Sequence, residues 1–227
     1  MPYSAPYFVE NNLHIINIYP LMILSMQQII HIHGGNIFID ETTFLAYLQQ
    51  NDYDPFEEKK RWRDRLKQQL SSTHQCLFPE MPNTRNASYK ARKIWFEKLF
   101  PYLNNEGTIL IGHSLGTIFL LKYLTENHFP QPIVQLHLVG TVLDEQEMPE
   151  FEDYLGDFAF DISTISDITK QVEQIFIYHS KDDDCCPYSH AERLSAFLPD
   201  AKLLTFTDRG HFIQADFPEL LANIIAK

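Results

Sequence analysis

Short apolar runs alternate with longer amphipathic stretches along most of the chain. Six runs have the length and composition of buried strands: residues 28–32, 73–78, 108–112, 133–139, 174–179 and 202–206. Six longer stretches have the spacing of helices: residues 41–49, 55–70, 88–103, 115–127, 188–197 and 218–225. Because strands that alternate with helices form parallel sheets covered on both faces, the pattern predicts an α/β fold. We expect a mostly parallel, twisted sheet between two layers of helices.

Two of the predicted helices carry further signals. Residues 115–127 are apolar nearly all round, which is typical of a helix packed on the centre of a sheet. Pro218 suits the first turn of the last helix, and Asp216 with Glu219 three residues later resembles a capping box. We therefore expect Asp216 to cap this helix and the helix to anchor the loop before it.

The first 25 residues fit neither a strand nor a helix period well. Their apolar part, residues 13–24, is shorter than the roughly 20 residues of a membrane-spanning helix. Glu10 stands where a signal peptide would carry positive charge, and no Lys or Arg precedes the apolar part. We interpret residues 1–25 as an N-terminal extension and residues 26–227 as a single domain. Whether the extension belongs to the native domain stays open.

Charge and cysteine content limit the partners and the compartment. The net charge of −12 repels phosphate backbones and anionic lipids, so neither nucleic acid nor a membrane is an expected partner. The alternating charges of residues 55–70 indicate a solvated helix face with internal ion pairs. Three cysteines are too few for a disulfide framework, which favours the cytoplasm. We expect a neutral or cationic small-molecule substrate and a monomer or small homo-oligomer.

One motif carries chemistry. The predicted strand 108–112 runs into Gly112-His113-Ser114-Leu115-Gly116 and then directly into a predicted helix. This is the G-x-S-x-G pattern of a nucleophilic serine on a sharp turn, where Gly112 and Gly116 leave room for the backbone. The helix points its N-terminus at Ser114, so the backbone N–H of Leu115 is a natural donor to an oxyanion.

A serine hydroxyl needs a general base, which an acid must orient. In this arrangement the acid and the histidine follow the serine in that order, each after a later strand. His211 follows the strand 202–206 beside Gly210, and we take it as the base. Three consecutive carboxylates follow the strand 174–179, and composition alone does not choose among them: Asp182, Asp183 and Asp184.

The turn after the first strand offers a second oxyanion donor. Gly34 and Gly35 allow backbone to approach a reacting carbonyl closely, and we favour the N–H of Gly35. The alternative is a metal site, since His31 and His33 point to one face of a strand and His113 lies in the elbow. We prefer a support role for His33 and expect neither a metal nor an organic cofactor.

The chain resembles the α/β-hydrolase superfamily, and within it the small serine hydrolases of the retinoblastoma-binding protein 9 type, from Met26 to the C-terminus. The resemblance rests on four segments: Gly112-His113-Ser114-x-Gly116, Phe78-x-x-Met81-Pro82-Asn83 before the helix with Trp95, Ser180-x-Asp182-Asp183-x-x-x-Pro187, and Asp208-x-Gly210-His211-Phe212. In that family the acid stands four residues before the proline, which implies Asp183. Two positions depart from the family's pattern. The residue after the nucleophile is often small but here is Leu115, and the residue before the proline is usually aliphatic but here is Cys186. The L-x-C-x-E pattern that recognises pocket proteins is absent, so that partnership is not implied.

These residues predict a serine hydrolase of the carboxylesterase type. Ser114, His211 and Asp183 would cleave small carboxylic esters through an acyl-serine intermediate, with amides and thioesters as further candidates. An aromatic group between the fourth and fifth strands would either line an acyl pocket or pack in the core: Phe151, Tyr154, Phe158 and Phe160. The competing class is a non-catalytic protein-interaction module on a hydrolase scaffold.

Overall fold

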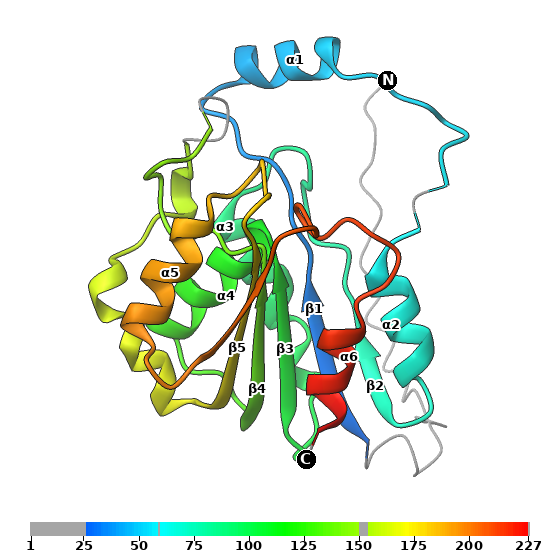
Figure 1. The fold of residues 1–227 in the computed structure, drawn as a ribbon, viewed down its shortest axis with the longest axis vertical. Helices are drawn as coiled ribbons and strands as arrows, with labels where there is room; N and C mark the ends of the chain where they lie inside the picture. The colour runs from blue at the N-terminus through cyan, green and yellow to red at the C-terminus, as the bar shows by residue number, and fades with distance from the viewer. Residues whose placement is uncertain (1–25, 59, 150–153, 227) are drawn as a thin grey trace, which may run out of the picture.

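The computed structural model describes residues 26–58, 60–149 and 154–226 (Figure 1). Within these residues six strands form one parallel sheet in the order β2-β1-β3-β4-β5-β6. The strands, in chain order, are β1 Gln27–Ile32, β2 His74–Leu77, β3 Thr108–His113, β4 Ile133–Val139, β5 Val172–Ser180 and β6 Lys202–Phe206. All six correspond to the predicted strands. Every residue of β3 is buried, as expected for a strand of mostly apolar sequence in the middle of a parallel sheet.

Helices cover both faces of the sheet, as predicted. The helices are α1 Glu41–Gln50, α2 Trp62–Leu70, α3 Tyr89–Glu97, α4 Leu115–Glu126, α5 Tyr188–Phe197 and α6 Pro218–Ile225, with 3₁₀ segments η2 Phe100–Tyr102, η3 Gly156–Phe158 and η4 Ile162–Lys170. Apolar side chains of α3, α4 and α5 form one core with the sheet, and those of α2 and α6 form a second core on its opposite face. The molecule therefore has three layers.

Two predicted helices are shorter than expected, for physical reasons. The helix expected over 55–70 begins at Trp62, because Trp62, Leu66 and Leu70 share a buried face while Phe56 is 89% exposed. The helix expected over 88–103 ends at Glu97 and is followed by η2. Pro101 explains this break, since its ring conflicts with the carbonyl four residues earlier.

The expected capping box of the last helix is wrong. The N-cap of α6 is Phe217, without a side-chain hydrogen bond. The Asp216 carboxylate instead pairs with Arg65, at 2.8 Å from Nε and 2.9 Å from Nη1. Glu219 accepts from Arg209 at 2.7 Å. Asp216, in the loop before α6, ties that loop to α2, and Glu219 on α6 ties it to the helix through Arg209. The helix therefore anchors the preceding loop as expected, although no capping box forms.

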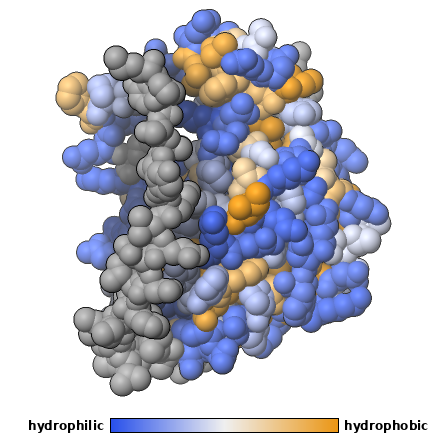
Figure 2. All heavy atoms as spheres, turned by 180° about the vertical axis from the view of Figure 1, so that it is seen from behind, coloured by the Kyte–Doolittle hydropathy of each residue, from blue (hydrophilic) through white to orange (hydrophobic). Residues whose placement is uncertain are grey.

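The helix α1 stands apart from both cores. It has a complete capping box between Asp40 and Thr43 but buries none of its residues. It lies at the upper end of the molecule, beyond the carboxyl ends of the strands (Figure 1). Seen from behind, the surface is mostly hydrophilic, whereas hydrophobic residues gather at this upper end (Figure 2). Exposed apolar side chains here include Ile39, Leu45 and Leu48.

Two further expectations concern the N-terminal extension and membrane-spanning helices. Residues 1–25, interpreted as an extension, lie outside the described residues, so the domain boundary stays a prediction. In the described part of the chain, no helix combines the length and the apolar content that a membrane crossing needs.

Candidate active site

Ser114 occupies a strained turn between β3 and α4. Its φ of 54° and ψ of −124° are unusual for a residue with a side chain. A Cβ on Gly116 would overlap the carbonyl oxygen of Ile32, and one on Gly112 would lie 2.6 Å from the carbonyl oxygen of Gly116. Only glycine fits at these two positions, so close strand–helix packing holds Ser114 in the elbow that the motif predicts.

The side chains of His211 and Asp183 meet after β6 and β5. His211 Nδ1 lies 2.9 Å from Oδ2 and 3.1 Å from Oδ1 of Asp183, whose side chain is fully buried. Oδ1 also accepts the N–H groups of Cys185 and Cys186, both at 2.9 Å. Burial alone would raise the pKa of the Asp183 carboxyl, but the hydrogen bonds from His211 and the two N–H groups hold it below its ordinary value. Asp183 is therefore an ionised partner for the imidazole.

The neighbouring carboxylates, Asp182 and Asp184, do not contact the His211 ring. Asp182 bonds to the Ser180 hydroxyl and accepts the N–H of Gly210 at 3.0 Å, so it holds the loop that carries His211. The Ser180 hydrogen bond is the main cause that lowers the pKa of Asp182. Asp184 is exposed. The geometry thus distinguishes three residues that composition could not.

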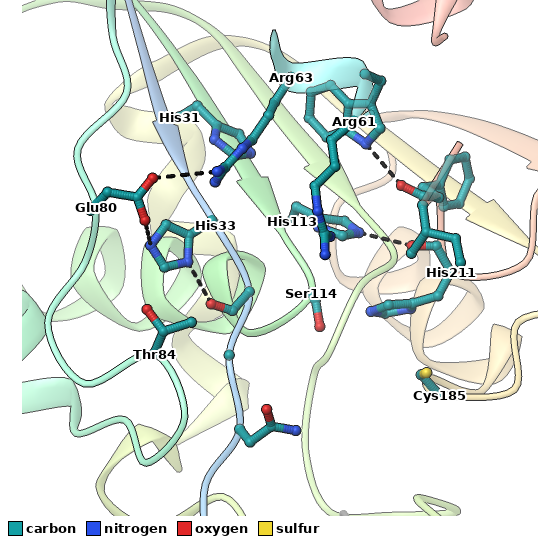
Figure 3. A pocket seen from close by; sticks show the side chains of 16 residues that line it. His31, His33, Arg61, Arg63, Glu80, Thr84, His113, Ser114, Cys185 and His211 are labelled. Carbon is teal, nitrogen blue, oxygen red and sulfur yellow. Dashed lines mark hydrogen bonds and ion pairs between the residues drawn. The ribbon is translucent and has the colours of Figure 1, made fainter. Parts of the chain in front are cut away.

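Ser114 and His211 line the same cavity of about 380 Å³, and the imidazole reaches toward the hydroxyl (Figure 3). No hydrogen bond joins the two side chains among the described residues.

Two hydrogen bonds hold the backbone of the His211 loop. The carbonyl of His211 accepts Nε2–H of His113 at 2.9 Å. Burial lowers the pKa of His113 to about 3, so this imidazole is neutral. Trp62 Nε1 donates to the next carbonyl, that of Phe212, at 2.9 Å.

Gly140, which follows β4, is a site residue that the sequence analysis missed. Its φ is +57°, and a Cβ there would lie 3.2 Å from Cε1 of His211 and 3.6 Å from Oδ2 of Asp183. Any side chain would therefore press on the His211–Asp183 pair. The signal available in the sequence was a lone glycine directly after a buried strand.

The turn after β1 packs against Ser114. A Cβ on Gly34 would lie 3.0 Å from the Cβ of Ser114. The buried guanidinium of Arg92 donates to the carbonyls of His33, at 3.0 Å, and of Gly34, at 2.8 Å. Because the N–H of a trans peptide points opposite to its C=O, the N–H of Gly35 points away from Arg92. Burial lowers the pKa of Arg92 to about 10, which leaves it charged.

His33 supports the same turn, as expected. Its Nε2 accepts the N–H of Met81 at 2.8 Å, so Nδ1 carries the proton and donates to the Gly34 carbonyl at 2.7 Å. Arg92 was not anticipated because its position in an amphipathic helix gave no sign of an inward, buried charge.

A second cavity of about 530 Å³ adjoins the first, and Gly35, Asn36 and Ser114 line both. We call the first the polar cavity; its lining includes His31, His33, Arg61, Arg63, Glu80 and His113. We call the second the apolar cavity; its lining includes Phe38, Tyr47, Leu115, Val142, Tyr154 and Leu155. Ser114 therefore stands where a polar and an apolar cavity meet.

The aromatic group between β4 and β5 divides between the two roles considered. Tyr154 lines the apolar cavity, whereas Phe158 is fully buried in the core and Phe160 packs against it. Phe151 lies outside the described residues.

Of the residues described, one group has the spacing for a metal: Asp183, Cys185 and His211, whose ligand atoms lie within 4.8 Å of one another. The Asp183 carboxylate already accepts three hydrogen bonds there, and His211 Nδ1 is engaged with it. His31, His33 and His113, the alternative considered from sequence, do not form such a group. The donor set thus suits a carboxylate–imidazole pair better than a resident ion.

The three-layer fold and the strand–serine–helix turn define an α/β hydrolase, and comparisons with known proteins agree. A family model described as serine hydrolase matches residues 54–219. The rat serine hydrolase RBBP9 is 31% identical over 148 residues, which cover 65% of this chain and 74% of that protein.

Solved structures give the same fold. The ydeN gene product from B. subtilis superposes with a TM-score of 0.65 at 21% identity, covering 88% of this chain and 96% of that one. A carboxylesterase, CesB from Bacillus subtilis, gives a TM-score of 0.51 at 12% identity, covering 88% and 82%. On the family match, the chain belongs to the serine hydrolase family.

Proposed function

We propose that this serine hydrolase cleaves carboxylic esters with apolar acyl groups through an acyl-Ser114 intermediate. The observation that carries the proposal is the buried, ionised Asp183 bonded to His211 Nδ1, with His211 and the strained Ser114 lining one cavity. Asp183 fixes the imidazole so that Nε2 is left to take the proton of Ser114 Oγ. Hydrogen bonds between nucleophile and base are often long in a free enzyme and tighten when substrate binds.

The reaction would proceed in two halves. Ser114 Oγ attacks the carbonyl carbon while His211 takes its proton, and the oxyanion is held by the N–H groups of Leu115 and Gly35. His211 then protonates the leaving oxygen, the bond between acyl carbon and leaving oxygen breaks, and acyl-Ser114 remains. Water, deprotonated by His211, hydrolyses this intermediate.

The two cavities determine the orientation in which the ester binds. The leaving group must receive its proton from His211, which lines the polar cavity and not the apolar one. The leaving group therefore extends into the polar cavity. The acyl chain takes the apolar cavity beside Leu115, Val142 and Phe38, where burial of each methylene contributes about 0.8 kcal/mol.

A panel of p-nitrophenyl esters tests the proposal. We expect turnover of acetate, butyrate and octanoate esters by the wild-type chain, with an initial burst of nitrophenol if deacylation is slow. Ser114→Ala should lose at least about 10³-fold in kcat, because nucleophilic catalysis is gone. Turnover at the wild-type rate in Ser114→Ala would overturn the assignment. Thioester and anilide analogues of the same acyl groups then rank the bond type.

A further inference from the structure

Arg61 lines the polar cavity and has no carboxylate partner among the residues that the structure describes. It precedes the first residue of α2, caps nothing with its side chain, and forms no ion pair among the described residues. Its guanidinium extends down toward Ser114 beside the ring of His113 (Figure 3). Ser114, His113 and Arg61 all line this cavity, so a bound leaving group would lie within reach of the cation.

The other charges of the cavity compensate one another. Arg63 pairs with Glu80, with Nη2 3.3 Å from Oε1. His31, His33 and His113 are neutral because burial lowers the pKa of each imidazole. Arg61 therefore leaves the polar cavity with one positive charge in excess, although the chain as a whole carries −12.

A second polar group in the cavity also has no partner. His31 is 2% exposed and lines the cavity, and its buried Nε2 makes no hydrogen bond to any residue that the structure describes. A buried polar atom without a partner is costly unless water or a ligand satisfies it. Arg61 is therefore the group of this cavity that favours an anion, whereas the neutral His31 ring only adds a polar atom to the cavity wall.

We propose that the substrate is an ester whose leaving group, an alcohol or phenol, carries a carboxylate that pairs with Arg61 in the polar cavity. This rests on the proposed function, which places the leaving group on the His211 side. A carboxylate matches the planar guanidinium with two parallel hydrogen bonds, and its single negative charge balances the single uncompensated cation. The products are a free carboxylic acid and a hydroxy acid, with water supplying the hydroxyl to the acyl carbon and the proton to the leaving oxygen. The charge of the polar cavity therefore favours an anionic substrate, whereas the net charge of the whole chain favoured a neutral or cationic one.

The test uses two butyrate esters that differ at one group. 4-(Butyryloxy)phenylacetic acid carries the carboxylate, and 4-(butyryloxy)phenylacetamide replaces it with a neutral amide on the same phenol. We expect the wild-type chain to prefer the acid by about tenfold in kcat/KM, as for a charge-assisted hydrogen bond in a half-buried site. Arg61→Gln should remove this preference, so that the ratio of kcat/KM for the acid to kcat/KM for the amide falls to about one. Added sodium chloride should reduce the preference, since the pair is partly open to solvent.

Arg65→Gln is the matched control, because Arg65 lies on α2, pairs with Asp216 and does not line the cavity. It should retain the wild-type preference, and unfolding temperatures check that both variants fold. Equal rates for the two esters in the wild type, or a preference that survives Arg61→Gln, would overturn the inference. If neither ester were hydrolysed, the proposed function itself would fail instead.

Discussion

At the residue scale, the contacts of each carboxylate after β5 determine its role around His211. The three adjacent carboxylates have different contacts. Asp182 accepts from a loop backbone, Asp183 contacts His211, and the exposed Asp184 contacts only the neighbouring Cys185 thiol among the described residues. Sequence reasoning could propose Ser114 and His211 because each follows a recognisable strand. It could place the acid only by family resemblance, since backbone geometry decides which of three neighbours faces the imidazole.

Asparagine at these three positions gives the first prediction. Asp183→Asn should lower kcat by about 10⁴-fold, because an amide no longer holds the required tautomer of His211 or stabilises its protonated form. Asp184→Asn should leave kcat within about twofold, and Asp182→Asn should lie between, through the loop of His211. Ester hydrolysis by the three purified variants provides the measurement. A dead Asp184→Asn enzyme would show that the acid is assigned to the wrong residue.

Gly140 gives a second prediction. Gly140→Ala introduces a Cβ 3.2 Å from His211 Cε1 in a left-handed backbone, so kcat should fall and stability should drop by about 1–2 kcal/mol. Gly107→Ala is the control, because Gly107 has a φ of +83° and would contact Val134 instead. Urea unfolding should show a loss for both variants, and kinetics a loss for Gly140→Ala alone. Unchanged kinetics in Gly140→Ala would mean that His211 is free to move away.

At the element scale, the positions of whole segments follow from the sequence better than their ends do. The four inner strands were predictable because buried parallel strands are continuous apolar runs. The edge strands β2 and β6 are only partly buried, and their place between helical stretches predicted them. The start of α2 was not, because the charged residues before Trp62 continue a helical pattern without a buried face. The role of α1 was equally hidden. Its residues predict a helix, but only tertiary structure shows that Ala46 and Tyr47 border the apolar cavity.

This position of α1 makes a prediction about acyl length. Ala46→Phe places a large side chain on the lining of the apolar cavity and should lower kcat/KM for octanoate esters by about tenfold or more. Acetate esters should be affected little, because they leave the outer part of the cavity empty. Leu45→Phe is the control, since Leu45 is 48% exposed and does not line this cavity. Equal losses for acetate and octanoate would argue that the acyl chain lies elsewhere.

At the scale of the whole molecule, neutral buried histidines make stability depend on pH. Burial is the main cause that lowers the pKa of the histidines concerned: His31, His33, His113, His137, His179 and His190. Their folded-state pKa values lie below the value of about 6.5 in an unfolded chain, so the unfolded state binds more protons in acid. The resulting stabilisation is present above about pH 6.5 and is lost as the pH falls below it.

The measurement is urea unfolding between about pH 7.5 and about pH 5. With a folded pKa of about 3, His113 and His137 should each account for about 2 kcal/mol of the loss at pH 5. His137→Gln, away from the catalytic residues, should flatten the pH dependence. A free energy of unfolding that is constant across this range would contradict the neutral, buried state of these imidazoles.

We propose that the fold activates Ser114 through His211, and labelling with a fluorophosphonate probe measures this activation. The probe reacts with an activated serine, so the folded chain should form one adduct, located on Ser114 by peptide mass spectrometry. Heat-denatured protein should remain unlabelled, and His211→Gln should react far more slowly than the wild type. An adduct on another residue would show that Ser114 is not the nucleophile, and labelling of His211→Gln at the wild-type rate would show that His211 does not activate it.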